Sequence, residues 1–375
     1  MNFHNKFQEH RKNIRNATAD YIEALSTLTA YAAYVATLKD LKLTEEPNGY
    51  ADCKKILNDS KNLAKEWVNT TYLIMINTPK AVTQNLDDMM GYLNTALGAS
   101  GSTSGIVSDR FTRAILNAST CCDSIIAKYT LVNNSIDDYQ DTFDNLKTNL
   151  EKAKAYLLSF NDIENEIYDS VESMIDDLKQ RIAKIAVKFG WGVVNGVAGL
   201  AIVNLGPVGL FLGVFLFIFG VIEILSALSD LKELVGELNN LISRLTNLSK
   251  DIININSTMD TVNILIDLHD SLSGKVGFLI YTWKNLSSEM SLLQGYIDDA
   301  SFEAPGHLGN NPAQRDVEYA IAELKGIIDD NKQLDIGSFN ICTDSINLTE
   351  SSEEMGDVLN KSNRMEIVEY VKEFG

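Results

Sequence analysis

The chain has 375 residues, 45% of them hydrophobic, and a formal net charge of −19. So acidic a composition argues against nucleic-acid binding, because the phosphate backbone needs Lys and Arg to neutralise it. The same charge argues against simple adsorption to an anionic membrane, so membrane binding would depend on hydrophobic insertion. The length allows one to three domains, and 5 prolines leave room for long uninterrupted helices.

The first twenty or so residues contain no apolar signal-peptide core. We therefore expect a protein that stays inside the cell or is secreted without an N-terminal signal peptide. The four cysteines, Cys53, Cys121, Cys122 and Cys342, form neither a disulfide framework nor a CxxC metal pair. Buried reduced thiols are expected, with a Cys53–Cys342 bridge as the alternative.

Apolar residues at helical spacing predict the N-terminal helices. The predicted ranges are 5–40, 51–76 and 79–97, with Asn77-Thr78-Pro79 separating the last two because Thr78 can cap a helix whose first turn holds Pro79. A flexible loop is expected over 98–105, where the sequence is GASGSTSG.

Two long periodic segments come next, and they predict long antiparallel helices. The first runs over 108–188 and would span roughly 120 Å if continuous, at 1.5 Å per residue. The second begins at Leu228 and keeps a heptad seam to His269, then continues less cleanly to about 297. Beyond it we expect a loop over 303–312, a helix over 313–330, an irregular segment over 334–348 with room for a short strand, and a terminal acidic helix over 351–374.

Between the two long segments, residues 189–222 contain no Asp, Glu, Lys, Arg or His. Gly206-Pro207 marks a turn near the middle and divides the run into arms of residues 189–205 and 208–222. A bilayer crossing needs about 20 apolar residues as helix, and each arm reaches that length with a few flanking residues. The alternative is a buried helical hairpin in a soluble core, which rarely needs so long an uncharged run.

The second arm is rich in large apolar residues, whose insertion is favourable by about 0.3–0.6 kcal/mol each. The first arm is thinner, and Gly192 and Gly196 have the spacing that lets helices approach closely in lipid. Hinge or turn positions are expected at Gly190, Gly206, Pro207 and Gly220. The predicted membrane-inserting residues are Phe189, Trp191, Val193, Val194, Val197, Leu200, Ile202, Val203, Leu205, Val208, Leu210, Phe211, Leu212, Val214, Phe215, Leu216, Phe217, Ile218, Phe219, Val221 and Ile222.

Nothing in the sequence indicates catalysis, a metal site or a cofactor. The four histidines form no HExxH or His/Cys cluster, and no phosphate-binding loop or GxSxG motif occurs. His269 lies on the heptad seam, where a core histidine is the expected interpretation. Paired carboxylates such as Asp176-Asp177 face different directions on a helix and are expected to be solvated. We therefore expect that the protein is not an enzyme.

Long helices interrupted by an apolar head resemble the cytolysin A superfamily of α-helical pore-forming toxins. Among its members, which include haemolysin BL and non-haemolytic enterotoxin components, the chain is most similar to the B component of Gram-negative tripartite toxins. The resemblance implies an all-α fold with an elongated helical tail, formed by residues 1–184 and 229–375. Residues 185–228 would be the membrane-inserting head, a hydrophobic hairpin. Its eight glycines make alternative backbone states accessible, so the sequence leaves helix and β-structure both open for the soluble state.

The resemblance also implies the partners. They are the lipid bilayer of a target cell, other toxin components, and further copies of the chain in a soluble dimer or tetramer and in a ring-shaped pore. Two other interpretations stay open on the sequence alone. One is a resident two-pass membrane protein with cytoplasmic coiled coils, and the other is a soluble coiled-coil adaptor whose apolar run is a dimer interface.

Overall fold

A computed structural model describes most of the chain. The described residues are 2–98, 106–159, 166–187, 198–204, 211–217, 231–299, 312–332, 340–342, 346–347, 354 and 364–375. Within them the chain is predominantly helical, with strands at the predicted head and near the C-terminus. The predicted fold class, a helical bundle, is confirmed, and the head, for which the sequence leaves β-structure open, contains two strands. The predicted loops over 98–105 and 303–312 lie almost entirely outside the described residues.

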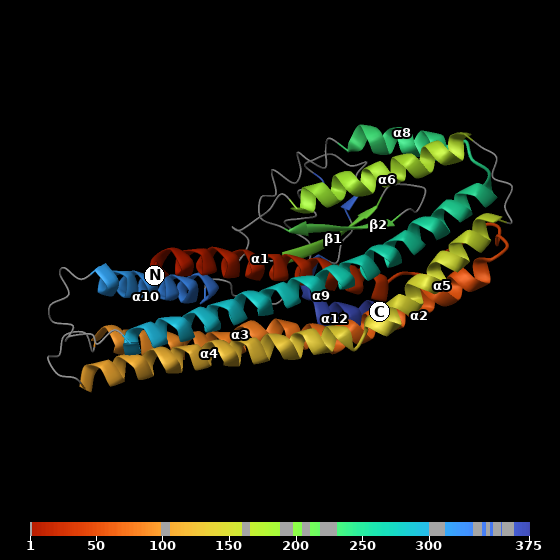
Figure 1. The fold of residues 1–375 in the computed structure, drawn as a ribbon. Coiled ribbons are helices and arrows are strands. Elements are labelled where there is room, and N and C mark those ends of the chain that lie inside the picture. The colour runs from red at the N-terminus through yellow and green to blue at the C-terminus, as the bar shows by residue number, and fades with distance from the viewer. Residues whose placement is uncertain are drawn as a thin grey trace. The chain divides into compact units, whose positions relative to one another are not determined.

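The helices and strands group into two compact units. The first unit comprises residues 1–24, 74–137 and 272–336. It is built from the N-terminal part of α1 (Phe3–Ala36), most of α3 (Thr71–Gly98), α4 (Ile106–Asp137), the C-terminal part of α9 (Asn247–Asp299) and α10 (Pro312–Lys332). Tyr21, Ile115, Trp283 and Leu324 are fully buried in it, one from each of four helices. Helices α3, α4, α9 and α10 run alongside one another (Figure 1).

The second unit comprises residues 25–73, 138–271 and 337–375. Its core includes Leu28, Trp67, Phe143 and Met259, all essentially inaccessible to solvent. Besides parts of α1 and α9, it contains α2 (Tyr50–Asn69), α5 (Gln140–Ser159), α6 (Glu166–Val187), β1 (Ala198–Asn204), β2 (Phe211–Phe217), α8 (Lys232–Ser243), β3 (Asn340–Cys342), β4 (Ile346–Asn347), β5 (Arg364–Glu366) and α12 (Ile367–Phe374).

Two contacts of the second unit position α2. Buried Asp251 accepts the backbone N–H groups of Thr44 and Glu45 at 2.7 and 2.8 Å, which fixes the loop before the helix. Gly49 then starts α2 with φ 87°, a conformation that favours glycine. A Cβ on Gly49 would lie 2.8 Å from the ring of Tyr156, so the glycine also lets α2 and α5 approach closely.

The second predicted helix is wrong in its boundary. It ends at Asn69, and α3 begins at Thr71 and passes through Pro79 without a break. Thr70 has non-helical dihedrals, and its hydroxyl lies 2.9 Å from that of Tyr139. Tyr139 lies in the turn between α4 and α5, so the two helix interruptions are joined by a hydrogen bond.

The continuous helix expected over 108–188 is also wrong, because α4 ends at Asp137 and α5 starts at Gln140. The second long segment is interrupted at residues 244–246, between α8 and α9. There Arg244 and Leu245 donate to carbonyls three residues back, and the Thr246 hydroxyl accepts from the Ser249 N–H and caps α9. A heptad pattern records which faces are buried, and a capped turn can interrupt the helix without breaking that pattern.

The expectation for the C-terminal region is half confirmed. Short strands do occur in the segment predicted to be irregular, as β3 and β4. The single acidic helix expected over 351–374 is wrong, because residues 364–366 form β5 and only α12 follows as helix. Glu366 ends the strand and accepts the N–H groups of Val368 and Glu369, so the same residue closes β5 and caps α12.

Candidate functional site

The described residues of the uncharged run, β1 and β2, pair as a β-hairpin. Strands β1 and β2 pair antiparallel over their whole length, with Ala198 opposite Phe217 and Asn204 opposite Phe211. The sequences AGLAIVN and FLGVFLF are rich in the β-branched and aromatic residues that favour strands. Of the two states that the sequence leaves open for the head, helix and β-structure, the structure shows β-structure for these residues.

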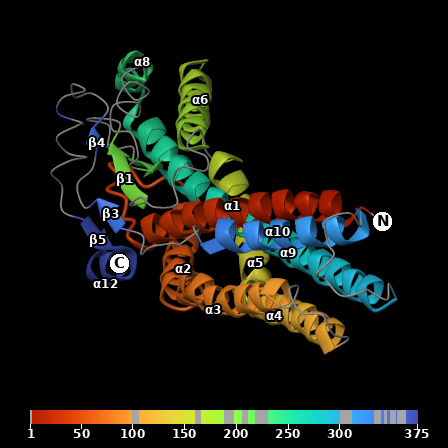
Figure 2. The same cartoon turned by 90° about the vertical axis from the view of Figure 1, so that its left-hand side faces the viewer.

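Strand β1 lies at the centre of a five-stranded sheet rather than at an edge. On the side away from β2 it pairs in parallel with β3, where Gly199 meets Asn340, and with β4, where Val203 meets Ile346. Strand β3 pairs in turn with β5. We call β3, β4 and β5 the C-terminal strands; Figure 2 shows them beside β1. The head hairpin is therefore joined by backbone hydrogen bonds to the far end of the chain.

Helices contact this sheet at both ends of its strand order, within the second unit. Helix α6 packs against β2 and α8 and lies beside the head strands in Figure 1. Its apolar residues Val171, Ile175 and Leu178 are buried. At the other edge α12 contacts β3, β5 and α2 through buried residues that include Ile367 and Tyr370. The sheet thus links the head to α2 through β3, β5 and α12.

Part of the predicted site falls on described residues. Leu200, Ile202 and Val203 lie in β1, and Phe211, Leu212, Val214, Phe215, Leu216 and Phe217 lie in β2. The backbone pairing brings these two groups together. The other predicted inserting and hinge residues lie outside the described residues: Phe189, Gly190, Trp191, Val193, Val194, Val197, Leu205, Gly206, Pro207, Val208, Leu210, Ile218, Phe219, Gly220, Val221 and Ile222. Among the helices that the structure describes, none has the length and apolar character needed to span a bilayer.

The thiols and the seam histidine behave as core residues. Cys53, Cys121 and Cys122 are free and buried, so the alternative bridge from Cys53 to Cys342 is wrong. Burial raises the pKa of Cys53 to about 11, which keeps it a poorly reactive thiol. His269 is fully buried and stacks on Phe143 with ring centroids 4.1 Å apart. The described residues hold no group of three or more His, Cys, Asp or Glu suited to a metal ion.

Sequence reasoning missed the C-terminal strands as part of the site. They are two or three residues long, too short for the alternation that identifies a strand. The sequence signal that could have found them is the absence of a helical pattern. The segment 334–348 lacks helical periodicity and holds isolated apolar residues such as Ile341 and Ile346, which suits strands added to an existing sheet.

Comparisons with known proteins place the fold. No protein-family model matches the chain, and no curated protein sequence does. Among solved structures, soluble SmhB of the tripartite α-pore-forming toxin Smh from Serratia marcescens superposes with a TM-score of 0.61 at 13% identity, covering 97% of this chain and 99% of that one. The HblL1 toxin component of Bacillus cereus gives 0.63 at 13%, covering 87% and 97%.

Soluble AhlB of the tripartite α-pore-forming toxin AHL from Aeromonas hydrophila gives 0.58 at 13% identity, covering 96% of this chain and 99% of that one. Each match extends over nearly the whole of the known structure. The resemblance seen in the sequence is thereby confirmed at the level of structure: the chain has the fold of the components of tripartite α-helical pore-forming toxins.

Proposed function

We propose that the chain is a non-enzymatic subunit of a pore-forming toxin, which inserts residues 185–228 into a target-cell membrane and assembles with partner components into a lytic pore. One observation supports this most. Two described stretches of the uncharged run, β1 and β2, pair with each other, and β1 also pairs with strands from the far end of the chain, within a fold shared with SmhB and AhlB. The tripartite toxins to which those proteins belong suggest that partner components complete the pore.

The bilayer supplies a reason for the head to change conformation. Hydrocarbon offers no water to backbone polar groups, so helices and closed sheets are tolerated and an open two-stranded hairpin is not. Once parted, each arm is long enough for a helix of about 20 residues, or roughly 30 Å. Water favours the paired strands and lipid favours the helical hairpin, and the same sequence serves both.

The C-terminal strands would hold the soluble state. Pairing β1 to β3 and β4 occupies the backbone groups that face away from β2, so the hairpin cannot become helical until this pairing breaks. Insertion therefore requires β1 to separate from β3 and β4. A chain in which these strands are joined covalently should bind no membrane.

A single substitution can test this. The pairing of Leu200 with Ile341, extended by one residue, sets position 201 beside native Cys342. We expect Ala201→Cys to form a disulfide with Cys342 under oxidation. Oxidised protein should then release no dye from liposomes when mixed with its partner components, and reduction should restore release.

Ala201→Ser is the matched control, because it keeps a similar size but cannot cross-link. It should release dye equally under both conditions. The native thiols Cys53, Cys121 and Cys122 are buried and should not interfere. Equal dye release from the fully cross-linked and the reduced protein would show that the sheet stays closed during lysis and would overturn the mechanism. Absence of release in every mixture would overturn the proposed function.

A further inference from the structure

Helix α6, which leads into the head, has its charges separated along its length. Its N-terminal part is acidic, and its C-terminal part is basic. The acidic residues are Glu166, Asp169, Glu172, Asp176 and Asp177, and the basic ones are Lys179, Arg181, Lys184 and, directly after the helix, Lys188. No Asp or Glu occurs from Leu178 to Ile222, in a chain whose net charge is −19. We call residues 179–188 the basic end of α6.

Three of these four cations have helical spacing in the sequence. Arg181 and Lys184 are three residues apart, and Lys188 comes four residues later, a spacing typical of cations that share one side of a helix. The buried residues Val171, Ile175 and Leu178 occupy a different face. Arg181 itself is exposed, with 54% of its side chain accessible to solvent.

Ion pairing also distinguishes this segment. Several other cations pair with carboxylates of other elements: Lys6 with Glu289, Lys154 with Asp260 and Lys275 with Asp20. Arg181 instead pairs with Asp177, one turn earlier on its own helix, at 2.9 Å. This ion pair would travel with α6 if the helix moved, so it does not tie Arg181 to the rest of the fold.

The helix dipole accounts for only part of this pattern. It favours acids in the first turn and bases in the last turn, and its effect falls off beyond those turns. Since α6 ends at Val187, Lys179 and Arg181 lie further in than the last turn. Their position is explained better by the uncharged run that comes next in the chain.

We propose that the basic end of α6 binds anionic lipid headgroups at the membrane surface where the head enters, an inference that rests on the proposed function. A Lys or Arg near an anionic bilayer strengthens binding by about fivefold, within a Debye length of about 8 Å. Asp177 precedes Lys184 by seven residues, or about 10 Å of helix, so its charge is largely screened there. The net charge opposes adsorption of the whole protein, while the segment next to the head attracts the bilayer.

The test compares vesicles of phosphatidylcholine alone with vesicles of equal parts phosphatidylcholine and phosphatidylglycerol. Binding is followed by co-sedimentation, and pore formation by dye release with the partner components. The variant is Arg181→Gln/Lys184→Gln/Lys188→Gln. The control is Lys12→Gln/Lys54→Gln/Lys55→Gln, which removes the same charge from exposed positions on α1 and α2.

The first variant should bind the anionic vesicles on the order of a hundredfold more weakly than wild type, and the neutral vesicles equally. The control should match wild type on both, and added salt should abolish the difference. Circular dichroism checks that both variants are folded. Equal losses in variant and control, or no wild-type preference for anionic vesicles, would overturn the inference. Equal dye release from the neutral and the anionic vesicles would also overturn the inference but would leave the proposed function intact. No dye release from either kind of vesicle would overturn the proposed function itself.

Discussion

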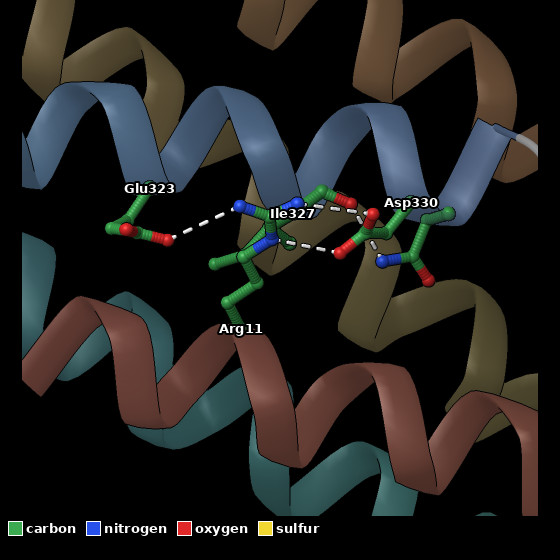
Figure 3. A network of polar contacts seen from close by, with 5 residues as sticks. Arg11, Glu323, Ile327 and Asp330 are labelled. Carbon is green, nitrogen blue, oxygen red and sulfur yellow. Dashed lines mark hydrogen bonds and ion pairs between the residues drawn. The ribbon is translucent and has the colours of Figure 1, made fainter.

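At the scale of single residues, Arg11 shows how the first unit couples its helices. Its Nε lies 2.8 Å from Asp330 and its Nη1 lies 3.3 Å from Glu323, so α1 and α10 are joined by a fork of two carboxylates (Figure 3). The guanidinium passes directly over Gly326, between those two acids in sequence, where a Cβ would collide with it. The glycine therefore makes room for the ion pairs.

This arrangement predicts that Gly326→Ala changes stability in a direction that depends on whether Arg11 is present. In wild type, Gly326→Ala should push the guanidinium away from its carboxylates and leave stability unchanged or reduced. In an Arg11→Ala background the same change should stabilise by about 0.5–1 kcal/mol, because alanine is the better helix former. Urea unfolding of the four proteins measures both values. Equal effects of Gly326→Ala in both backgrounds would show that the two residues do not interact.

His10 gives a pH dependence with a defined sign. Burial lowers its pKa below the usual value, while Glu289 and Glu9 oppose this and Lys6 adds to it. As the pH falls below about 6.5, His10 takes up a proton in the unfolded chain but not in the folded one. The folded state therefore loses stability until the pH passes the lowered pKa of His10 in the folded protein. His10→Gln should therefore lose less stability than wild type between about pH 7 and 5.5. Melting temperatures across that range that fall in parallel would contradict this.

At the scale of elements, the sequence predicts which faces are buried better than where helices stop. Leu146, Leu178, Leu238 and Ile266 follow the predicted spacing, and all are buried. The helix ends depend on local bonds that the pattern does not contain, such as the Thr246 cap and the Thr70–Tyr139 contact. The prediction placed a helix boundary at Pro79, but α3 continues through it, and a side chain of α1 bonds the carbonyl that the proline leaves without its helical donor.

That hydrogen bond can be tested. Pro79 has no N–H for the carbonyl of Met75, and the buried hydroxyl of Tyr21 donates to this carbonyl at 3.4 Å. Tyr21→Phe should cost about 1 kcal/mol, since it leaves the carbonyl unpaired. Pro79→Ala restores the N–H, so in that background the cost of Tyr21→Phe should shrink. A double-mutant cycle by chemical denaturation measures the coupling, and additive effects would show that the hydroxyl has no such role.

At the scale of the whole molecule, the sequence marks the uncharged run but not the strands that pair with it. An uncharged run is visible to inspection, whereas pairing of β1 with β3 joins residues far apart in sequence and leaves no periodic trace. The long-range strand pairs are set by the folded helices that bring the segments together. The fold class was predictable for this reason, whereas the head's secondary structure and the sheet topology were not.

Insertion should depend on the second arm. We expect Phe215→Asp/Phe219→Asp to make the free energy of membrane insertion less favourable by several kcal/mol, at roughly 2.5–3.5 kcal/mol for each acid near the bilayer centre. The helical bundle should fold as before, which circular dichroism checks, while vesicle co-sedimentation should report lost binding. Phe215→Leu/Phe219→Leu is the matched control and should insert normally. Full lytic activity of the Asp variant would place the membrane-crossing element elsewhere.

The head also bears on assembly in water. We expect the soluble protein to associate through its apolar head as a dimer or tetramer, because contiguous apolar surface tends to be covered. Multi-angle light scattering measures the mass directly, and the Phe215→Asp/Phe219→Asp variant should shift it toward the monomer. A monomeric wild type would show that the chain covers its own head without a second copy.

The parallel pairing of Gly199 with Asn340 also sets an order of events during synthesis. A ribosome adding about 5–20 residues per second takes on the order of ten seconds to pass from one strand to the other. Throughout that interval the most apolar part of the chain is made but its partner strands are not. On the proposed function, the cell that produces the protein must therefore keep the nascent chain from its own membranes until the C-terminal strands have been made.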